Sequence, residues 1–214
     1  MPNTHEVALY LRSLVDYEEG DLISQLKLYK LVYYAQAWSL VFLKEPLFDG
    51  EIQAWQHGPV PVELRAAYKT YEYREIPKPS ESREDLAKPF TDEQLRVLHL
   101  VWEKYGDFTA TKLYKLCHRE APWENARGDL PLDAPSNILI PVDSIQEYYA
   151  EFAYIDNGEF FINDEALKEN KSNKLLGTLQ LKDGTSKTLE FSELIEFFNE
   201  NTENIVQTTL PPFQ

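Results

Sequence analysis

Apolar residues recur at three- and four-residue steps through much of the chain, which is the spacing of helices that bury one face. The first such stretch predicts a helix over residues 4–17, capped by Thr4. The second, residues 24–43, is apolar on nearly all sides and should end before Pro46. We therefore expect it to be a central helix, with other helices packed against several of its faces.

Short segments of a different pattern interrupt the helices. Polar and apolar residues alternate over residues 51–55, and we expect this strand to pair with the extended residues 137–140. Residues 57–61, HGPVP, should form a rigid loop, because two prolines remove backbone donors and glycine permits conformations closed to other residues. Three prolines among serines and charged residues at 76–90 indicate a mobile connector.

Capping signals and apolar periodicity predict the remaining helices of the N-terminal region. They are expected after Pro122 and over residues 91–106, 109–119 and 141–152. The fold class that follows is mainly α: a helical N-terminal domain, residues 1–152, with a short two-strand element.

The C-terminal region has a different character. Hairpin-type turns at residues 156–158 (DNG) and 182–184 (KDG) are flanked by β-prone residues. A further amphipathic helix is expected over residues 192–201, and residues 208–214 have the composition of a loose tail. We therefore predict a small α+β C-terminal appendage over residues 153–214.

The charge balance limits the classes of partner. The chain has 36 acidic and 21 basic residues, a formal net charge of −15, which argues against direct nucleic-acid binding and favours a basic partner. The single cysteine excludes a disulfide framework, and we expect no secretory signal, so the expected location is the cytoplasm. The most apolar stretch, residues 31–43, is shorter than the roughly 20 residues that a membrane crossing requires.

Few residues have the spacing of a catalytic or metal site. The histidines, His5, His57, His99 and His118, are scattered singly, and neither a glycine-rich phosphate loop nor a GxSxG motif occurs. Cys117 and His118 are neighbours on a helix and point about 100° apart. We therefore predict no catalytic residue, no metal and no cofactor. His57, in the proline-rich loop, is a candidate for recognition or acid–base chemistry, and the plainer alternative is a bond to nearby backbone.

Three separated blocks of sequence resemble one known family. They are KLYKLVYYAQAW at residues 27–38, EPLFDGEIQAWQHGPV at 45–60 and TKLYKLCHREAPWENAR at 111–127. In order and spacing they are similar to the motifs of the Panacea (SocA-like) antitoxin domain, which is found in phage-associated proteins. The resemblance covers roughly residues 5–150. The residues that match the family's motifs are Tyr33, Tyr34, Trp38, Trp55, His57, Gly58, Pro59, Trp123 and Arg127.

The resemblance implies a mainly helical bacterial or phage antitoxin, encoded beside its toxin, that neutralises the toxin by direct contact. Members are paired with very different toxins, including small alarmone-synthetase-like enzymes that modify tRNA and other translation inhibitors. One member instead delivers its toxin to a Clp protease. We therefore expect sequestration of the product of an adjacent gene, with proteolytic delivery as the second hypothesis and a small-molecule enzyme built around His57 as the third.

The motif residues have two interpretations, structural and partner-binding. Trp38, Trp55 and Trp123 are large apolar anchors that we expect chiefly to hold the domain together. His57 and Arg127 can equally be structural or meet the partner, since a guanidinium offers a planar fork to a carboxylate or a carbonyl.

Overall fold

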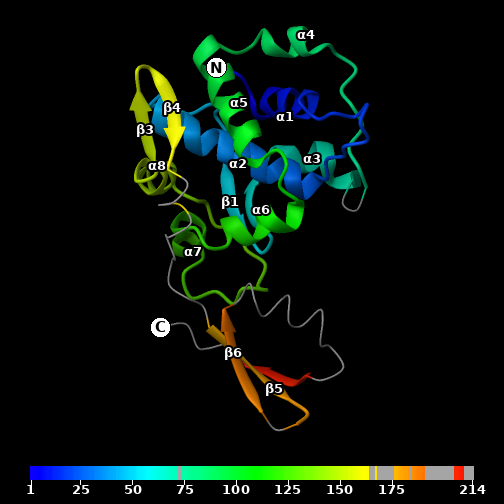
Figure 1. Ribbon diagram of the computed structural model, residues 1–214, viewed down its shortest axis with the longest axis vertical. Coiled ribbons are helices and arrows are strands. Elements are labelled where there is room, and N and C mark those ends of the chain that lie inside the picture. Colours follow the sequence, from blue (N-terminus) through cyan, green and yellow to red (C-terminus); the bar gives the residue numbers. More distant parts are fainter. Residues whose placement is uncertain (72–73, 164–166, 168–175, 184, 191–204, 210–214) are drawn as a thin grey trace. The chain divides into compact units, whose positions relative to one another are not determined.

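The computed structural model (Figure 1) describes residues 1–71, 74–163, 167, 176–183, 185–190 and 205–209. The helices are α1 (Thr4–Ser13), α2 (Gln25–Phe42), α3 (Leu64–Tyr68), η1 (Lys69–Tyr71), α4 (Arg83–Ala87), α5 (Asp92–Tyr105), α6 (Ala110–Cys117), α7 (Ala121–Arg127) and α8 (Val142–Ala150). The strands are β1 (Ile52–Trp55), β2 (Gly58–Pro61), β3 (Ala153–Asp156), β4 (Glu159–Ile162), β5 (Leu176–Leu181), β6 (Ser186–Glu190) and β7 (Ile205–Thr209).

The chain forms two compact units, Met1–Glu169 and Asn170–Gln214. The first contains the helices and the hairpins β1–β2 and β3–β4, so the predicted mainly α fold is confirmed. The second contains an antiparallel sheet in the order β6-β5-β7. The sequence pattern placed the end of the helical domain at residue 152, whereas the first unit also includes β3 and β4. The ring of Phe160 in β4 stacks on that of Phe42 in α2, with centroids 4.6 Å apart.

The C-terminal predictions have different outcomes. β3 and β4 are joined at Asn157 and Gly158, which both have positive φ, as expected of the hairpin turn. β5 and β6 likewise pair on either side of the second predicted turn. The helix predicted over residues 192–201 lies outside the described residues. The loose tail predicted from residue 208 is wrong at its start, because Thr208 and Thr209 end β7 and pair with β5.

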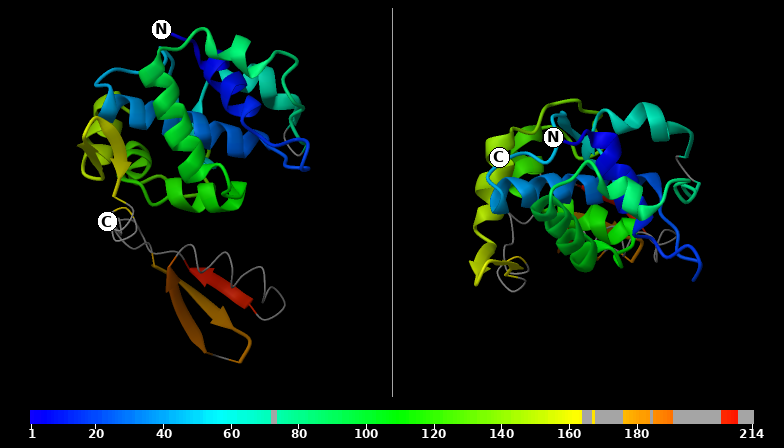
Figure 2. Two further views of the ribbon diagram at one scale, coloured as in Figure 1. Left: turned by 45° about the horizontal axis from the view of Figure 1, so that its top comes forward. Right: turned by 90° about the horizontal axis from the view of Figure 1, so that it is seen from above.

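Helix α2 runs through the middle of the first unit in Figures 1 and 2, with α1, α5, α6 and α8 packed against it. Ser24 caps it, and every residue from Leu28 to Phe42 is buried, which confirms the predicted central helix. Three of these buried residues are polar, and each donates a hydrogen bond to a backbone carbonyl. They are Lys30, Gln36 and Ser39.

The strand pairing predicted for residues 51–55 is present but secondary. Residues 138–140 lie antiparallel to β1 and share two backbone hydrogen bonds of 2.8 Å with it, one from Ala54 and one to Ile52. The main partner of β1 is β2. The rigid loop predicted over residues 57–61 is therefore wrong for Gly58–Pro61.

Two prolines fit into β2 because of their position in the ladder. Ala54 and Ile52 direct their backbone groups toward residues 138–140, so the residues opposite them, Pro59 and Pro61, face away from β1. Their missing N–H groups remove no bond between the strands, which is how an edge strand tolerates proline. The residue types at 58–61 favoured a loop, but the register of the hairpin allows these residues to form a strand.

Two other expectations from local sequence are wrong. Asn3, and not Thr4, caps α1, forming a capping box with Glu6, and the helix ends at Ser13. Residues 76–90, expected to be a mobile connector, contain α4 and are anchored by the buried side chains of Ile76 and Phe90.

Candidate functional site

The three motif blocks of the sequence meet at the β1–β2 hairpin. The first block lies in α2, the second forms the hairpin itself, and the third forms α6 and α7, which contact β2 and β1 respectively. Side chains of the first and third blocks reach the backbone carbonyl groups of residues 54–59. The site is therefore a set of contacts that hold one short piece of backbone.

Helix α7 holds the end of β1. The indole Nε1 of Trp123 donates to the carbonyl oxygen of Trp55 at 2.9 Å, and the guanidinium of Arg127 donates to that of Ala54 at 3.2 Å. Arg127 also donates to carbonyl oxygens of the loop that follows, at Pro131, Leu132 and Ala134. Both side chains are buried, with 1% of Trp123 and 3% of Arg127 exposed, and a contact between Arg127 and a partner stays a prediction.

Helices α2 and α6 hold the turn and β2 at the same end of the hairpin. The ammonium of Lys30, fully buried, donates to the carbonyl oxygen of Pro59 at 2.8 Å. The ring of His118 places Nε2 2.9 Å from the carbonyl oxygen of Gln56 and Nδ1 2.7 Å from that of Tyr114. Burial lowers the pKa of His118 to about 4, so at neutral pH the uncharged ring donates its one N–H to one of these oxygens.

Gly58 is the point of closest approach. Its φ of +90° is disfavoured for other residues, and a Cβ at this position would lie 2.5 Å from Sγ of Cys117 and 2.8 Å from Nζ of Lys30. The second of these atoms is the one that binds Pro59, so a side chain here would displace the contact that holds β2. Glycine is therefore required for both conformation and space.

A buried carboxyl group lies close enough to influence the Lys30 ammonium. Glu120 accepts a hydrogen bond from the hydroxyl of Tyr34 through Oε1 at 2.9 Å. Burial raises the pKa of Glu120 to about 7, while the neighbouring tyrosine hydroxyl groups and the charge of Lys30 act in the opposite direction. Burial lowers the pKa of Lys30 to about 8. The attraction between the two charged forms thus offsets part of the desolvation free energy of each group.

The aromatic motif residues of α2 belong to the core. Tyr33, Tyr34 and Trp38 are each at most 1% exposed. Tyr34 stacks on Tyr105 with centroids 4.1 Å apart, and Trp38 meets the ring of Tyr149 edge-on at 5.0 Å. Each is therefore placed to stabilise the packing of α2 against α5 and α8.

Two motif residues reach the surface. Trp55 is half-buried, with the guanidinium of Arg65 4.7 Å from its ring centroid. His57 is exposed at the surface. Protein atoms still displace part of the water around its ring, and this effect, together with the charge of Lys30, lowers its pKa. A contact between His57 and a partner stays a prediction. Within the described ranges, no group of three His, Cys, Asp or Glu residues could hold a metal ion.

Lys30 and Glu120 are the residues of this site that the sequence pattern did not single out. A signal for Lys30 was present, because a lysine inside a helix that is apolar on all sides must be buried with it. Glu120 gave no such signal, because its helix is short and its neighbours are mixed in polarity.

Comparison with known proteins identifies the segment that carries this site. Residues 28–124 match the family of the antitoxin SocA-like, Panacea domain. The Panacea resemblance is confirmed. The matched Panacea segment runs from α2 into α7, ends before Arg127, and suggests an antitoxin role. No curated protein and no solved structure matches the chain. Of the helices in the described residues, none has the length and apolar character needed to span a bilayer.

We expect Gly58→Ala to destabilise the protein far more than Gly20→Ala. Gly20 has φ of +89° and Gly58 +90°, so each variant carries backbone strain of about 1–2 kcal/mol. Nothing lies within 4 Å of a Cβ at Gly20, whereas at Gly58 the collisions add about 1–3 kcal/mol. Denaturant unfolding measures both losses, and equal losses would contradict tight packing beneath the hairpin.

We expect His118 to make the protein less stable in acid. Its pKa is about 4 when folded and 6.5 when unfolded, so the unfolded chain takes up the proton first. The stability present above pH 6.5 is then lost as the pH falls toward 4, by roughly 3 kcal/mol. Subtracting the unfolding profile of His118→Gln from that of the wild type cancels the other titrating groups. A difference that stays constant between pH 7 and pH 4 would show that the ring is not buried as an uncharged group.

Proposed function

We propose that the protein is an antitoxin that neutralises a cognate toxin by direct, stoichiometric binding in the cytoplasm. The observation that carries the proposal is the match of residues 28–124 to the SocA-like antitoxin family. The toxin is expected to be the product of an adjacent gene. The proposal assigns no catalytic step, metal or cofactor to this chain.

The placement of the motif residues supports a binding role. Trp123 and Arg127 direct their donors to the backbone of the hairpin and are buried, and the same holds for Lys30, which lies in the first motif block. A motif used in this way specifies a scaffold and leaves the exposed surface free to differ between members. Antitoxins that act on very different toxins need that freedom.

The charge of the chain supports a basic partner. Its formal net charge is −15, and a toxin that acts on tRNA needs a basic surface to hold phosphate groups. An acidic antitoxin would approach such a surface faster than a neutral one and would cover the residues that bind the substrate.

We expect the neighbouring gene to arrest growth when it is expressed alone, and co-expression of this protein to restore growth. The two proteins should co-purify as a stable complex, and the toxin in that complex should be inactive in a purified system without proteases.

Two results would contradict this account. If no neighbouring gene arrests growth, the antitoxin role loses its support. If the toxin stays fully active in the purified pair, and rescue in cells needs an intact Clp protease, proteolytic delivery replaces sequestration.

A further inference from the structure

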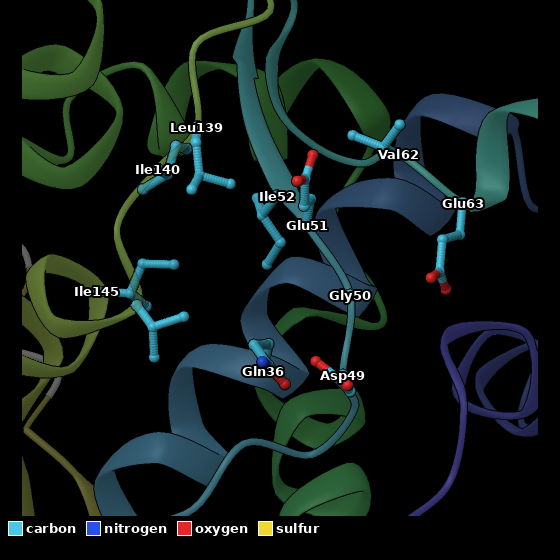
Figure 3. Close-up of a pocket in the computed structure, with 11 residues that line it drawn as sticks. Gln36, Asp49, Gly50, Glu51, Ile52, Val62, Glu63, Leu139, Ile140 and Ile145 are labelled. Atoms are coloured by element: carbon cyan, nitrogen blue, oxygen red, sulfur yellow. The ribbon is translucent and has the colours of Figure 1, made fainter.

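A groove opens beside β1 in the first unit, away from the hairpin contacts (Figure 3). It lies between the Asp49–Gly50 turn, the Val62–Glu63 turn and the segment that leads into α8. Its volume is about 500 Å³, within the range of about 300–1,000 Å³ that is typical of binding sites. Gln36 and residues 49–52 of the first two motif blocks line part of it, and none of the side chains that hold the hairpin carbonyl groups does.

One side of the groove is aliphatic. Ile52, Ile140 and Ile145 are buried at its base, and Leu139 and Val142 stand at its rim with 50% and 45% of their surface exposed. In Figure 3, Leu139, Ile140 and Ile145 lie together on one side of Ile52. When a partner covers exposed aliphatic side chains beside a concave surface, the removal of their apolar surface from water favours binding.

The other side is acidic. Asp49 and Glu63 lie across the groove from Leu139, Ile140 and Ile145 in Figure 3, with Val62 on their side, and Glu51 projects beside Ile52. All three carboxylates are exposed, no lysine or arginine lines the groove, and no described residue forms an ion pair with them. They also do not converge as a metal site would, among the residues that the structure places. Separated carboxylates of this kind suit separate cationic side chains.

Several polar side chains of the groove already have partners: Glu63 accepts a hydrogen bond from the hydroxyl of Thr4 at 2.6 Å, and Glu51 accepts one from the side-chain amide of Gln53 at 3.3 Å. Gln36 is buried and accepts hydrogen bonds from the backbone N–H groups of Leu47 and Phe48 while it donates to the carbonyl of Phe48. Its amide is therefore not available to a ligand. Recognition in the groove rests on aliphatic contact and negative charge.

We propose that this groove binds a segment of the toxin in which a branched aliphatic side chain is flanked by lysine or arginine. The inference rests on the proposed function and names the surface that performs it. A second copy of this chain, a nucleic acid or an anionic membrane would bring negative charge to the three carboxylates, and each is disfavoured for that reason.

The first test compares two leucines of equal exposure. Leu139 is 50% exposed at the rim, and Leu22 is 51% exposed outside the groove. Leu139→Glu should weaken binding of the purified toxin, the growth-arresting product of the neighbouring gene, by at least about tenfold. Leu22→Glu should change it by less than about twofold, and thermal melts confirm that both variants are folded.

The second test compares two charge reversals that change the net charge equally. Glu51 lines the groove, and Glu103 is an exposed residue of α5. Long-range steering is altered alike in Glu51→Lys and Glu103→Lys, so any difference between them reports local pairing. Glu51→Lys should weaken toxin binding at least about fivefold more than Glu103→Lys.

The outcomes separate this inference from the proposed function. If the wild type binds and neutralises the toxin but Leu139→Glu and Glu51→Lys do so equally well, the groove is not the binding surface and the antitoxin role stands. If the wild type is instead a dimer, and Leu139→Glu and Glu51→Lys are monomers, the groove binds a second copy of this chain and the inference is overturned. If the wild type binds no toxin, both fail.

Discussion

The structure depends on burying one positive charge. The ammonium of Lys30 lies in the middle of the central helix with no exposure to solvent, and a charge in that position is costly unless it is paired and hydrogen-bonded. Pro59 supplies the acceptor and Gly58 supplies the space, and the nearby carboxyl group of Glu120 acts to raise the pKa of the ammonium against the effect of burial. Each of these needs a further element in place: β2, the turn before it, and the start of α7.

This constraint explains why the family's motif residues are distributed over three distant blocks. The blocks meet because each supplies part of the environment of the same buried groups, and the side chains of His118, Trp123 and Arg127 extend that environment along the hairpin backbone. Buried and exposed residues then have different roles in the account. The motif builds a framework, and we assign partner recognition to exposed residues that surround the groove beside β1.

Much of the helical fold could be predicted from the sequence, because it follows from local patterns. The apolar run of α2 and the capping box at Thr91 each contain their own signal. β2 could not be predicted in this way, since the prolines that argued against a strand are harmless only in the register that places them facing outward. The two-residue turn at Gln56 and His57, which pairs Trp55 with Gly58, sets that register, and the outward-facing prolines become clear only once it is known.

The candidate site was predictable in part. Aromatic residues at helical spacing indicated a core, and Trp38 and Trp123 are indeed buried. The hairpin contacts were not visible, because their acceptors are backbone carbonyl groups that any sequence possesses. The groove was not visible either, although the pairing of residues 138–140 with β1 was predicted, because its other walls come from the Val62–Glu63 turn and from α8.

Amide hydrogen exchange of the hairpin, measured with and without toxin, tests the central claim most directly. Gln53 and Val60 face each other in the ladder, and the framework predicts that their N–H groups exchange slowly in the free protein and do not change when toxin binds. Binding should instead slow exchange around residues 138–142. Rapid exchange at Gln53 and Val60 in the free protein, with protection only in the complex, would contradict a hairpin held by buried side chains.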